Sequence, residues 1–185
     1  MSEQSMGDCY LFFYLAGVLI AAAVVDLYLH KIPNLLTYPT VLIALLYNLI
    51  YYGFHGLMLS LAGLLLGSAM LGIFYIAGGM GAGDVKLMGA VGAVLGPKHV
   101  LNAFLFTGII GGIYAVFIIL VRFEASKKVL KRITATVKTL VWTGNFIPIP
   151  AAEGEKPPKL CYGVAIALGA LLTMGLKAAQ YKLPI

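Results

Sequence analysis

Five long apolar runs constrain the fold of this chain more than any other feature. They lie at residues 9–28, 36–54, 57–77, 99–121 and 160–177. Each is close to the length of roughly 20 residues that an α-helix needs to cross the hydrocarbon core of a bilayer. The composition agrees, since 61% of the 185 residues are hydrophobic and only 11% are charged, whereas soluble domains carry about 25% charged residues. We therefore predict an all-α, polytopic integral membrane protein in which residues 1–185 form a single transmembrane domain.

The glycine-rich segment 78–96 decides how many times the chain crosses the membrane. Only 85–96 has a helical pattern, which is short for a span, and Pro97 follows it. If this segment crosses, there are six spans, and ten of the thirteen Lys and Arg residues fall on one side. Because positive residues favour the cytoplasm, both chain ends would then point outward. A re-entrant segment would weaken this bias only slightly, so we predict six spans.

Two hydrophilic regions complete the predicted topology. The N-terminal stretch contains Glu3 and Asp8 but no Lys or Arg, so we expect the first apolar run to be a retained span and not a signal peptide. Residues 122–159 are predicted to form a cytoplasmic loop, in which "KKVLKRITATVKTLVW" reads as a basic amphipathic helix on anionic lipid. An ordinary solvated loop is the alternative. The proline-rich "IPIPAAEGEKPPK" is predicted to be a linker, and the net charge of +6 is assigned to lipid and topology, not to nucleic acid.

Acidic residues are scarce, and only two lie against the apolar helices. Asp26 stands near the predicted cytoplasmic end of the first span, and Asp84 opens the fourth span on the same side. Carboxylates within membranes usually face the interior of a helix bundle or a wet cavity and carry function. The topology was derived from Lys and Arg alone, yet it brings both acids to one depth on one side.

Two adjacent carboxylates cannot both ionise, so such a pair shares one proton. One member can take a proton from water while the other donates a hydrogen bond to a scissile carbonyl. The pattern therefore predicts amide hydrolysis without a covalent enzyme intermediate. Two plainer interpretations stay open: Asp84 could be only the N-cap of its helix, and Asp26 could reach toward water or pair with Lys31 or Lys86.

The glycines of "GAGD", residues 81–84, let the chain turn with positive φ and let backbone approach a neighbour closely. We expect an extended substrate to approach there, with Asp84 held at the mouth of the site and not buried beneath side chains. Glycines in "SLAGLLLGSAMLG" and "FTGIIGGIY" instead predict close packing of helices.

Other chemistries lack their motifs. A phosphate-binding P-loop is excluded because Asp84 stands where its Lys should be. His30, His55 and His99 fall in three different predicted loops, and Cys9 and Cys161 form no C-x-x-C pair. We therefore predict no metal site and no cofactor.

The two aspartate motifs together resemble those of the type IV prepilin peptidases, the G-x-G-D aspartyl proteases of the cell membrane. "YGVAIALGAL" at 162–171 is similar to the last helix of that family. The resemblance implies that Asp26 and Asp84 are the catalytic pair of a prepilin leader peptidase, with its site facing the cytoplasm. The supporting motif positions are Ile32, Pro33 and Asn34 in the turn after the first helix, Gly81 and Gly83 in the active-site loop, and Lys86.

The resemblance also implies partners. Members cut the short basic leader from prepilin or preflagellin-like precursor proteins, and Glu153 or Glu155 are candidate contacts for it. Longer members carry an N-terminal methyltransferase region with two C-x-x-C pairs, which this sequence does not match, so we do not expect N-methylation. The short form resembles peptidases that serve tight-adherence (Flp) pili, and the archaeal preflagellin peptidases are close in function.

Two functions from other classes remain as alternatives. A proton- or cation-coupled transporter would use the same two aspartates as relay sites, and it predicts broken helices and inverted repeats near the midplane. A structural membrane subunit would use both acids only as caps or as residues that reach water. The two differ in whether Asp→Asn changes at both positions impair function.

Overall fold

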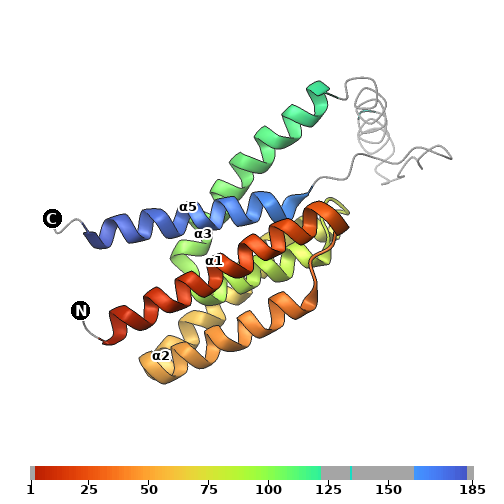
Figure 1. Ribbon diagram of the computed structural model, residues 1–185. Helices are drawn as coiled ribbons and strands as arrows, with labels where there is room; N and C mark the ends of the chain where they lie inside the picture. Colours follow the sequence, from red (N-terminus) through yellow and green to blue (C-terminus); the bar gives the residue numbers. More distant parts are fainter. Residues whose placement is uncertain (1–2, 122–133, 135–160, 183–185) are drawn as a thin grey trace. The chain divides into compact units, whose positions relative to one another are not determined.

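The computed structural model describes residues 3–121, 134 and 161–182, and every regular element in this part of the chain is an α-helix. The helices are α1 (Glu3–Leu29), α2 (Asn34–Ile76), α3 (Ala82–Val121) and α5 (Tyr162–Lys182) (Figure 1). Each contains a stretch that is long and apolar enough to cross a membrane. The predicted all-α class is therefore confirmed.

The chain divides into two compact units, Met1–Gly111 with Cys161–Ile185, and Gly112–Leu160. The first unit contains α1, α2, most of α3 and α5, and the description below concerns this unit. The predicted basic amphipathic helix and the linker fall within residues 122–159, which lie outside the described residues apart from Thr134. Glu153 and Glu155 lie outside them as well.

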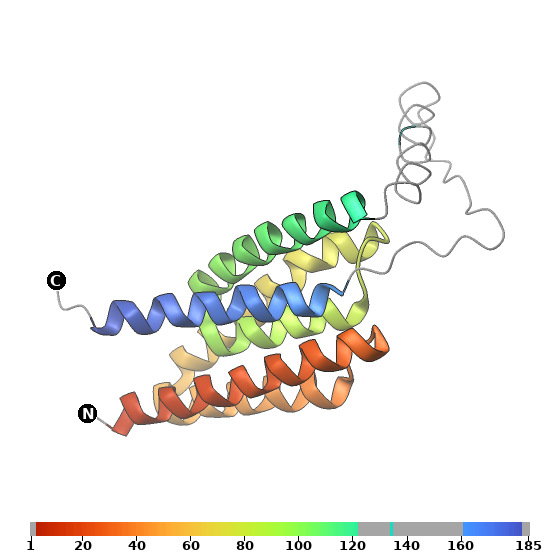
Figure 2. The same ribbon diagram turned by 45° about the horizontal axis from the view of Figure 1, so that its top comes forward.

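Two of the helices are interrupted by a glycine in a conformation that side chains rarely adopt. Gly53 in α2 has φ 63°, and Gly96 in α3 has φ 79°. Figure 2 shows that the chain turns back at both points, so that α2 and α3 each consist of two arms. Three of the four arms correspond to the apolar runs predicted at 36–54, 57–77 and 99–121, and the first arm of α3 falls within the glycine-rich segment 78–96. That all six helical segments cross the membrane stays a prediction.

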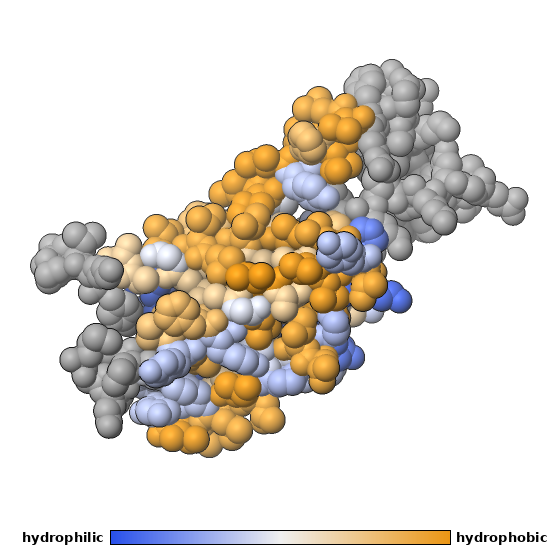
Figure 3. All heavy atoms as spheres, viewed as in Figure 1, coloured by the Kyte–Doolittle hydropathy of each residue, from blue (hydrophilic) through white to orange (hydrophobic). Residues whose placement is uncertain are grey.

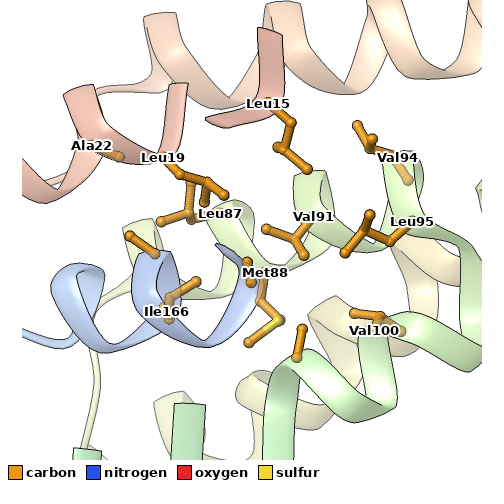
Figure 4. Close-up of a cluster of buried hydrophobic side chains, with 14 of the residues drawn as sticks. Leu15, Leu19, Ala22, Leu87, Met88, Val91, Val94, Leu95, Val100 and Ile166 are labelled. Carbon is orange, nitrogen blue, oxygen red and sulfur yellow. The ribbon is translucent and has the colours of Figure 1, made fainter. Parts of the chain in front are cut away.

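The buried core lies where α1, the first arm of α3 and α5 meet (Figure 4). Leu15 and Leu19 of α1, Met88 of α3 and Ile166 of α5 are fully buried. The first arm of α3 is the most enclosed element, because residues 87–95 are buried without exception. Helix α1 also packs against α2. The arm that begins with the "GAGD" motif is thus surrounded by the rest of this unit.

Glycines allow α2 and α3 to approach each other at backbone distance. A Cβ atom added at Gly63 would collide with the carbonyl oxygen of Gly92, and one added at Gly67 would collide with that of Met88. Close packing predicted from "SLAGLLLGSAMLG" is therefore confirmed. In "FTGIIGGIY" a Cβ atom added at Gly111 would make only ordinary contacts with Ala165 and Tyr162, and one added at Gly108 or Gly112 would meet no described atom within 4 Å. The close packing predicted for this segment is therefore not found among the described residues.

The outer surface of the unit carries many large hydrophobic side chains. Large hydrophobic side chains such as Tyr28, Leu35 and Ile76 are more than 80% exposed. Figure 3 shows hydrophobic residues over most of the visible face, with the most hydrophilic residues gathered mainly at the end where α1 finishes. Extensive exposed apolar surface of this kind is expected of a helix bundle that lies in lipid.

Candidate active site

Asp26 lies on the last turn of α1 and is held by the first turn of α5. Its side chain is only 5% exposed, and its Oδ2 accepts a hydrogen bond of 2.9 Å from the backbone N–H of Gly163. The first N–H groups of a helix have no intrahelical partner, and the positive end of the helix dipole favours a carboxylate there. The start of α5 therefore supplies both a donor and a favourable field to Asp26.

Asp84 is the third residue of α3. It is therefore not the N-cap residue of this helix, and the interpretation of Asp84 as the N-cap is wrong. Its Oδ2 reaches back to accept a 3.0 Å hydrogen bond from the N–H of Gly81, whose carbonyl accepts the N–H of Asp84. This reciprocal bonding is the carboxylate half of a capping box. Asp84 is 8% exposed. It is therefore more deeply buried than the predicted position at the mouth.

The two carboxylates that were predicted to meet line one pocket of about 210 Å³. They come from two different helices, Asp26 from α1 and Asp84 from α3. The pocket is lined by Asp26, His30, Lys31, Ile32, Gly81, Ala82, Gly83 and Asp84. The α1–α2 connection and the "GAGD" motif thus form its walls, with one carboxylate contributed from each side.

The glycines of the motif serve close approach, as predicted, but not positive φ. Neither Gly81 nor Gly83 has a positive φ; in this turn that conformation belongs to Gly78, at 77°. The N–H groups of Gly78 and Gly79 bond the carbonyls of Tyr75 and Phe74, which is the Schellman pattern that ends a helix at a glycine. The reversal of the chain is therefore completed before the motif begins.

Gly83 is the point at which the two sequence motifs touch. A Cβ atom added there would lie 3.0 Å from the Cβ and 3.3 Å from the N of Ile32. At Gly81 an added Cβ would lie 3.3 Å from Oδ2 of Asp84. The absence of a side chain at Gly83 lets the start of α3 lie against the α1–α2 connection. At Gly81 it leaves room for the carboxylate.

Lys86 binds at the start of α2 and not at Asp26. Its Nζ donates a 2.9 Å hydrogen bond to Oδ1 of Asn34, the first residue of α2, and lies 5.0 Å above the ring of Tyr38. Pro33 precedes Asn34 in an extended conformation as the N-cap of α2. Lys86 therefore ties the beginning of α3 to the beginning of α2, beside the pocket.

Sequence reasoning missed Gly163, His30 and Cys161 as residues of the site. Gly163 contacts Asp26 through its backbone, so no side-chain chemistry marks it; the only signal was its place in "YGVAIALGAL". His30 follows α1 with φ 50°, and its Nδ1 lies 3.2 Å from Sγ of Cys161. The other two histidines do not lie in loops as predicted, since His55 is in α2 and His99 in α3.

Metal ligands do not gather in the part of the chain that the structure describes: no three His, Cys, Asp or Glu residues there are grouped to hold a metal ion. The arrangement instead offers two buried carboxylates, each with one backbone N–H donor, in a pocket between helix ends. Two carboxyl groups in one pocket can act as an acid and a base toward water when they come close enough to share a proton.

A model of the type IV leader peptidase family matches residues 13–116, more than half of the chain and including both aspartate motifs. The chain belongs to the type IV leader peptidase family. Two similar curated proteins are both called "Prepilin leader peptidase/N-methyltransferase". The one from Bacillus subtilis (strain 168) is 35% identical over 101 residues, which are 53% of this chain and 40% of that protein.

The second, from Aeromonas salmonicida (strain A449), is 34% identical over 115 residues, or 58% of this chain and 39% of that protein. The match thus spans about two fifths of each of these longer relatives. No solved structure matches the chain. Helix α5 lies beyond the residues that the family model matches. Gly163 is therefore assigned to the site from its hydrogen bond to Asp26 and not from the family match.

Proposed function

We propose that this chain is a membrane aspartyl endopeptidase that cleaves the basic leader peptide from type IV prepilins. The observation that carries the proposal is the single pocket lined by Asp26 and Asp84, each with one oxygen bonded to a glycine amide. Membership of the type IV leader peptidase family supports it, as do the names of both relatives. The transporter alternative lacks such support, and neither of the helix breaks, at Gly53 and at Gly96, is among the residues that line the pocket.

In the proposed mechanism the two carboxyl groups hold one proton between them. The ionised member accepts a proton from a water molecule as the water oxygen attacks the carbonyl carbon of the scissile amide. The protonated member donates a hydrogen bond to the carbonyl oxygen, which stabilises the tetrahedral intermediate. Proton transfer to the amide nitrogen then breaks the C–N bond, and release of both peptides restores the one-proton pair. No atom of the protein bonds covalently to the substrate.

We further propose that the pocket faces the cytoplasm in the cell membrane. Lys31 lines the pocket and Lys86 lies beside it, and Lys and Arg next to membrane spans favour the cytoplasmic side. If the chain crosses the membrane six times, the end of the first unit that carries both aspartates would contact the leader peptide at the inner surface of the membrane. The leader's cleavage point lies just before the hydrophobic helix of the pilin, which would stay in the bilayer.

The decisive experiment is cleavage of a purified prepilin by the purified chain in detergent or liposomes. We expect a shortened product from the unaltered chain and none from Asp26→Asn or Asp84→Asn. Either change removes one of the two carboxyl groups, so that the pair can no longer supply both the base and the acid. Asp8→Asn is the matched control: this acid lies near the start of α1, where it accepts hydrogen bonds from Tyr47 and Tyr52. Full processing by both active-site variants would refute the proposal.

Three further measurements sharpen the result. The cleavage rate should follow a bell-shaped pH profile. Its rising and falling parts report the titration of the two carboxyl groups as a coupled pair, and neither part is assigned to Asp26 or Asp84 alone. A panel of precursors tests the proposal that Flp-type prepilins are preferred. Proton-linked uptake into liposomes without peptide cleavage would favour the transporter instead.

A further inference from the structure

Helix α5 reaches the site through its first turn, which is the part of a helix that is held least by its own hydrogen bonds. Gly163 lies in that turn and donates its N–H to Asp26. Glycine has the greatest backbone freedom of any residue, so it does not hold the turn by itself. Packing in the core, where Ile166 is fully buried, positions α5 as a whole. A contact at the very start of the helix would in addition fix its first turn on Asp26.

The contact between Cys161 and His30 is placed to do this. Cys161 is buried and stands directly before α5, two residues from Gly163. Its Sγ lies 3.2 Å from Nδ1 of His30, and the tautomer of the ring decides which of the two is the donor. His30 directly follows α1 and lines the pocket. The backbone N–H of His30 donates a 2.9 Å hydrogen bond to the backbone carbonyl of Asp26.

These contacts close a short ring of atoms around Asp26. One path runs from the backbone of Asp26 to His30, across to Cys161 and on to Gly163; the other is the hydrogen bond from Gly163 to the carboxylate. His30 holds a left-handed conformation that histidine and asparagine adopt more readily than most side chains. That turn directs the imidazole toward α5.

We infer that His30 and Cys161 are positioning residues, which clamp the first turn of α5 to the end of α1 so that the Gly163 amide stays on the Asp26 carboxylate. This inference rests on the proposed function, since it assigns the clamp to the aspartate of the peptidase site. Cys161 is not among the residues that line the pocket, and the role assigned to His30, which does line it, is its contact with Cys161 and not contact with the reacting atoms. Loss of the clamp therefore lowers the rate of the chemical step more than it weakens substrate binding.

The kinetic test compares Cys161→Ala with Cys161→Ser in the prepilin cleavage assay. Serine keeps a hydroxyl that can donate to or accept from the imidazole, whereas alanine removes the contact. We expect Cys161→Ala to lower kcat about 10- to 100-fold, the range produced by small misplacements of a catalytic group, with KM within about twofold of the unaltered value. Cys161→Ser should recover most of kcat. The matched control is Cys9→Ala, which changes the exposed cysteine near the start of α1.

A second test needs no cleavage. In the Cys9→Ala background Cys161 is the one remaining cysteine of the sequence, so its reaction with a maleimide reports the clamp directly. We expect slow labelling when His30 is present and at least a severalfold faster rate in His30→Asn, which keeps the left-handed turn but shortens the side chain. His55→Asn controls for loss of a histidine elsewhere.

The outcomes separate the two claims. An unaltered chain that cleaves no prepilin refutes the proposed function, and the labelling rates then still decide whether the clamp exists. An unchanged kcat in Cys161→Ala, or equal labelling in His30→Asn and the control, refutes the clamp while the peptidase stands. Equal losses in the Ala and Ser variants also refute it, because they show a need for the thiol and not for the contact with His30.

Discussion

At the scale of single residues, the site depends on where side chains are absent as much as on the two acids. Both carboxylates are bonded by glycine amides, and in each case a Cβ atom on that glycine would crowd the carboxylate that the amide binds. The acids are identifiable from sequence because ionisable groups against apolar helices are rare and costly. The glycine amide of α5 is not identifiable in that way, since a backbone N–H is present at nearly every residue.

Gly163→Ala tests this view most directly. An added Cβ would lie 2.8 Å from Oδ2 and 3.0 Å from Cγ of Asp26, so either the carboxylate or the first turn of α5 has to move. We expect kcat for prepilin cleavage to fall about 10- to 100-fold. The measurement is steady-state cleavage by purified protein, with thermal unfolding recorded in parallel.

Gly175→Ala is the control on the same helix, because an added Cβ there meets no described atom within 4 Å. It should leave kcat unchanged and, by the helix preference of alanine, stabilise the protein slightly. If Gly163→Ala cleaves as fast as this control, the amide of Gly163 has no part in placing Asp26.

Gly83→Ala tests the contact between the two motifs. The added Cβ would lie 3.0 Å from the Cβ of Ile32 and 3.4 Å from its carbonyl oxygen, which pushes the start of α3 away from the α1–α2 connection. We expect a lower rate of prepilin cleavage, because Asp84 is the next residue and moves with the helix. Gly72→Ala, which has open space around the added Cβ among the described residues, is the control. Equal cleavage by the two variants would contradict this role.

At the scale of elements, the first arm of α3 is positioned by its tight contact with α2. The sequence predicted this packing from the spacing of small residues. It predicted three of the four arms of α2 and α3 from apolar length, and the arm within 78–96 from the distribution of Lys and Arg. It could not predict which helix would be central. That depends on which backbones come together, and here the Gly63–Gly92 contact and the buried run 87–95 make the α3 arm the enclosed one.

Gly63→Ala should therefore destabilise the bundle. The added methyl group collides with the backbone of Gly92 and not with a flexible side chain, and overpacking of this kind costs about 1–3 kcal/mol. In a chain of this size that corresponds to a fall in Tm of several degrees, at about 2–4 °C per kcal/mol. The measurement is thermal unfolding in detergent. Gly17→Ala in α1 is the control, since an added Cβ there meets no described atom within 4 Å, and an equal Tm for both variants would contradict the contact.

At the scale of the whole molecule, the open structural question is how the arms cross the membrane. The first arm of α3 runs from Ala82 to the break at Gly96, so it is about 20 Å long at 1.5 Å per residue. The hydrocarbon core is about 30 Å thick. A lipid-facing helix of that length would be mismatched. This arm is enclosed by protein, however, so its length need not match the bilayer, and the bundle around it can bring both ends to water.

Labelling of single cysteines from each side of the membrane tests the six-crossing topology. In a background of Cys9→Ala and Cys161→Ser, cysteines are placed at the exposed positions Lys31, His55 and Lys98 and treated with a membrane-impermeant maleimide in spheroplasts and in inverted vesicles. Lys31→Cys and His55→Cys should react from opposite sides, whichever way residues 78–96 run. Lys98→Cys decides: six crossings require it to react from the same side as His55→Cys, with Lys31→Cys reacting from the cytoplasm. Reaction of Lys98→Cys from the same side as Lys31→Cys would make the first arm of α3 re-entrant and would place Lys31 and the basic stretch 122–159 on opposite faces, which weakens the bias of Lys and Arg toward one side.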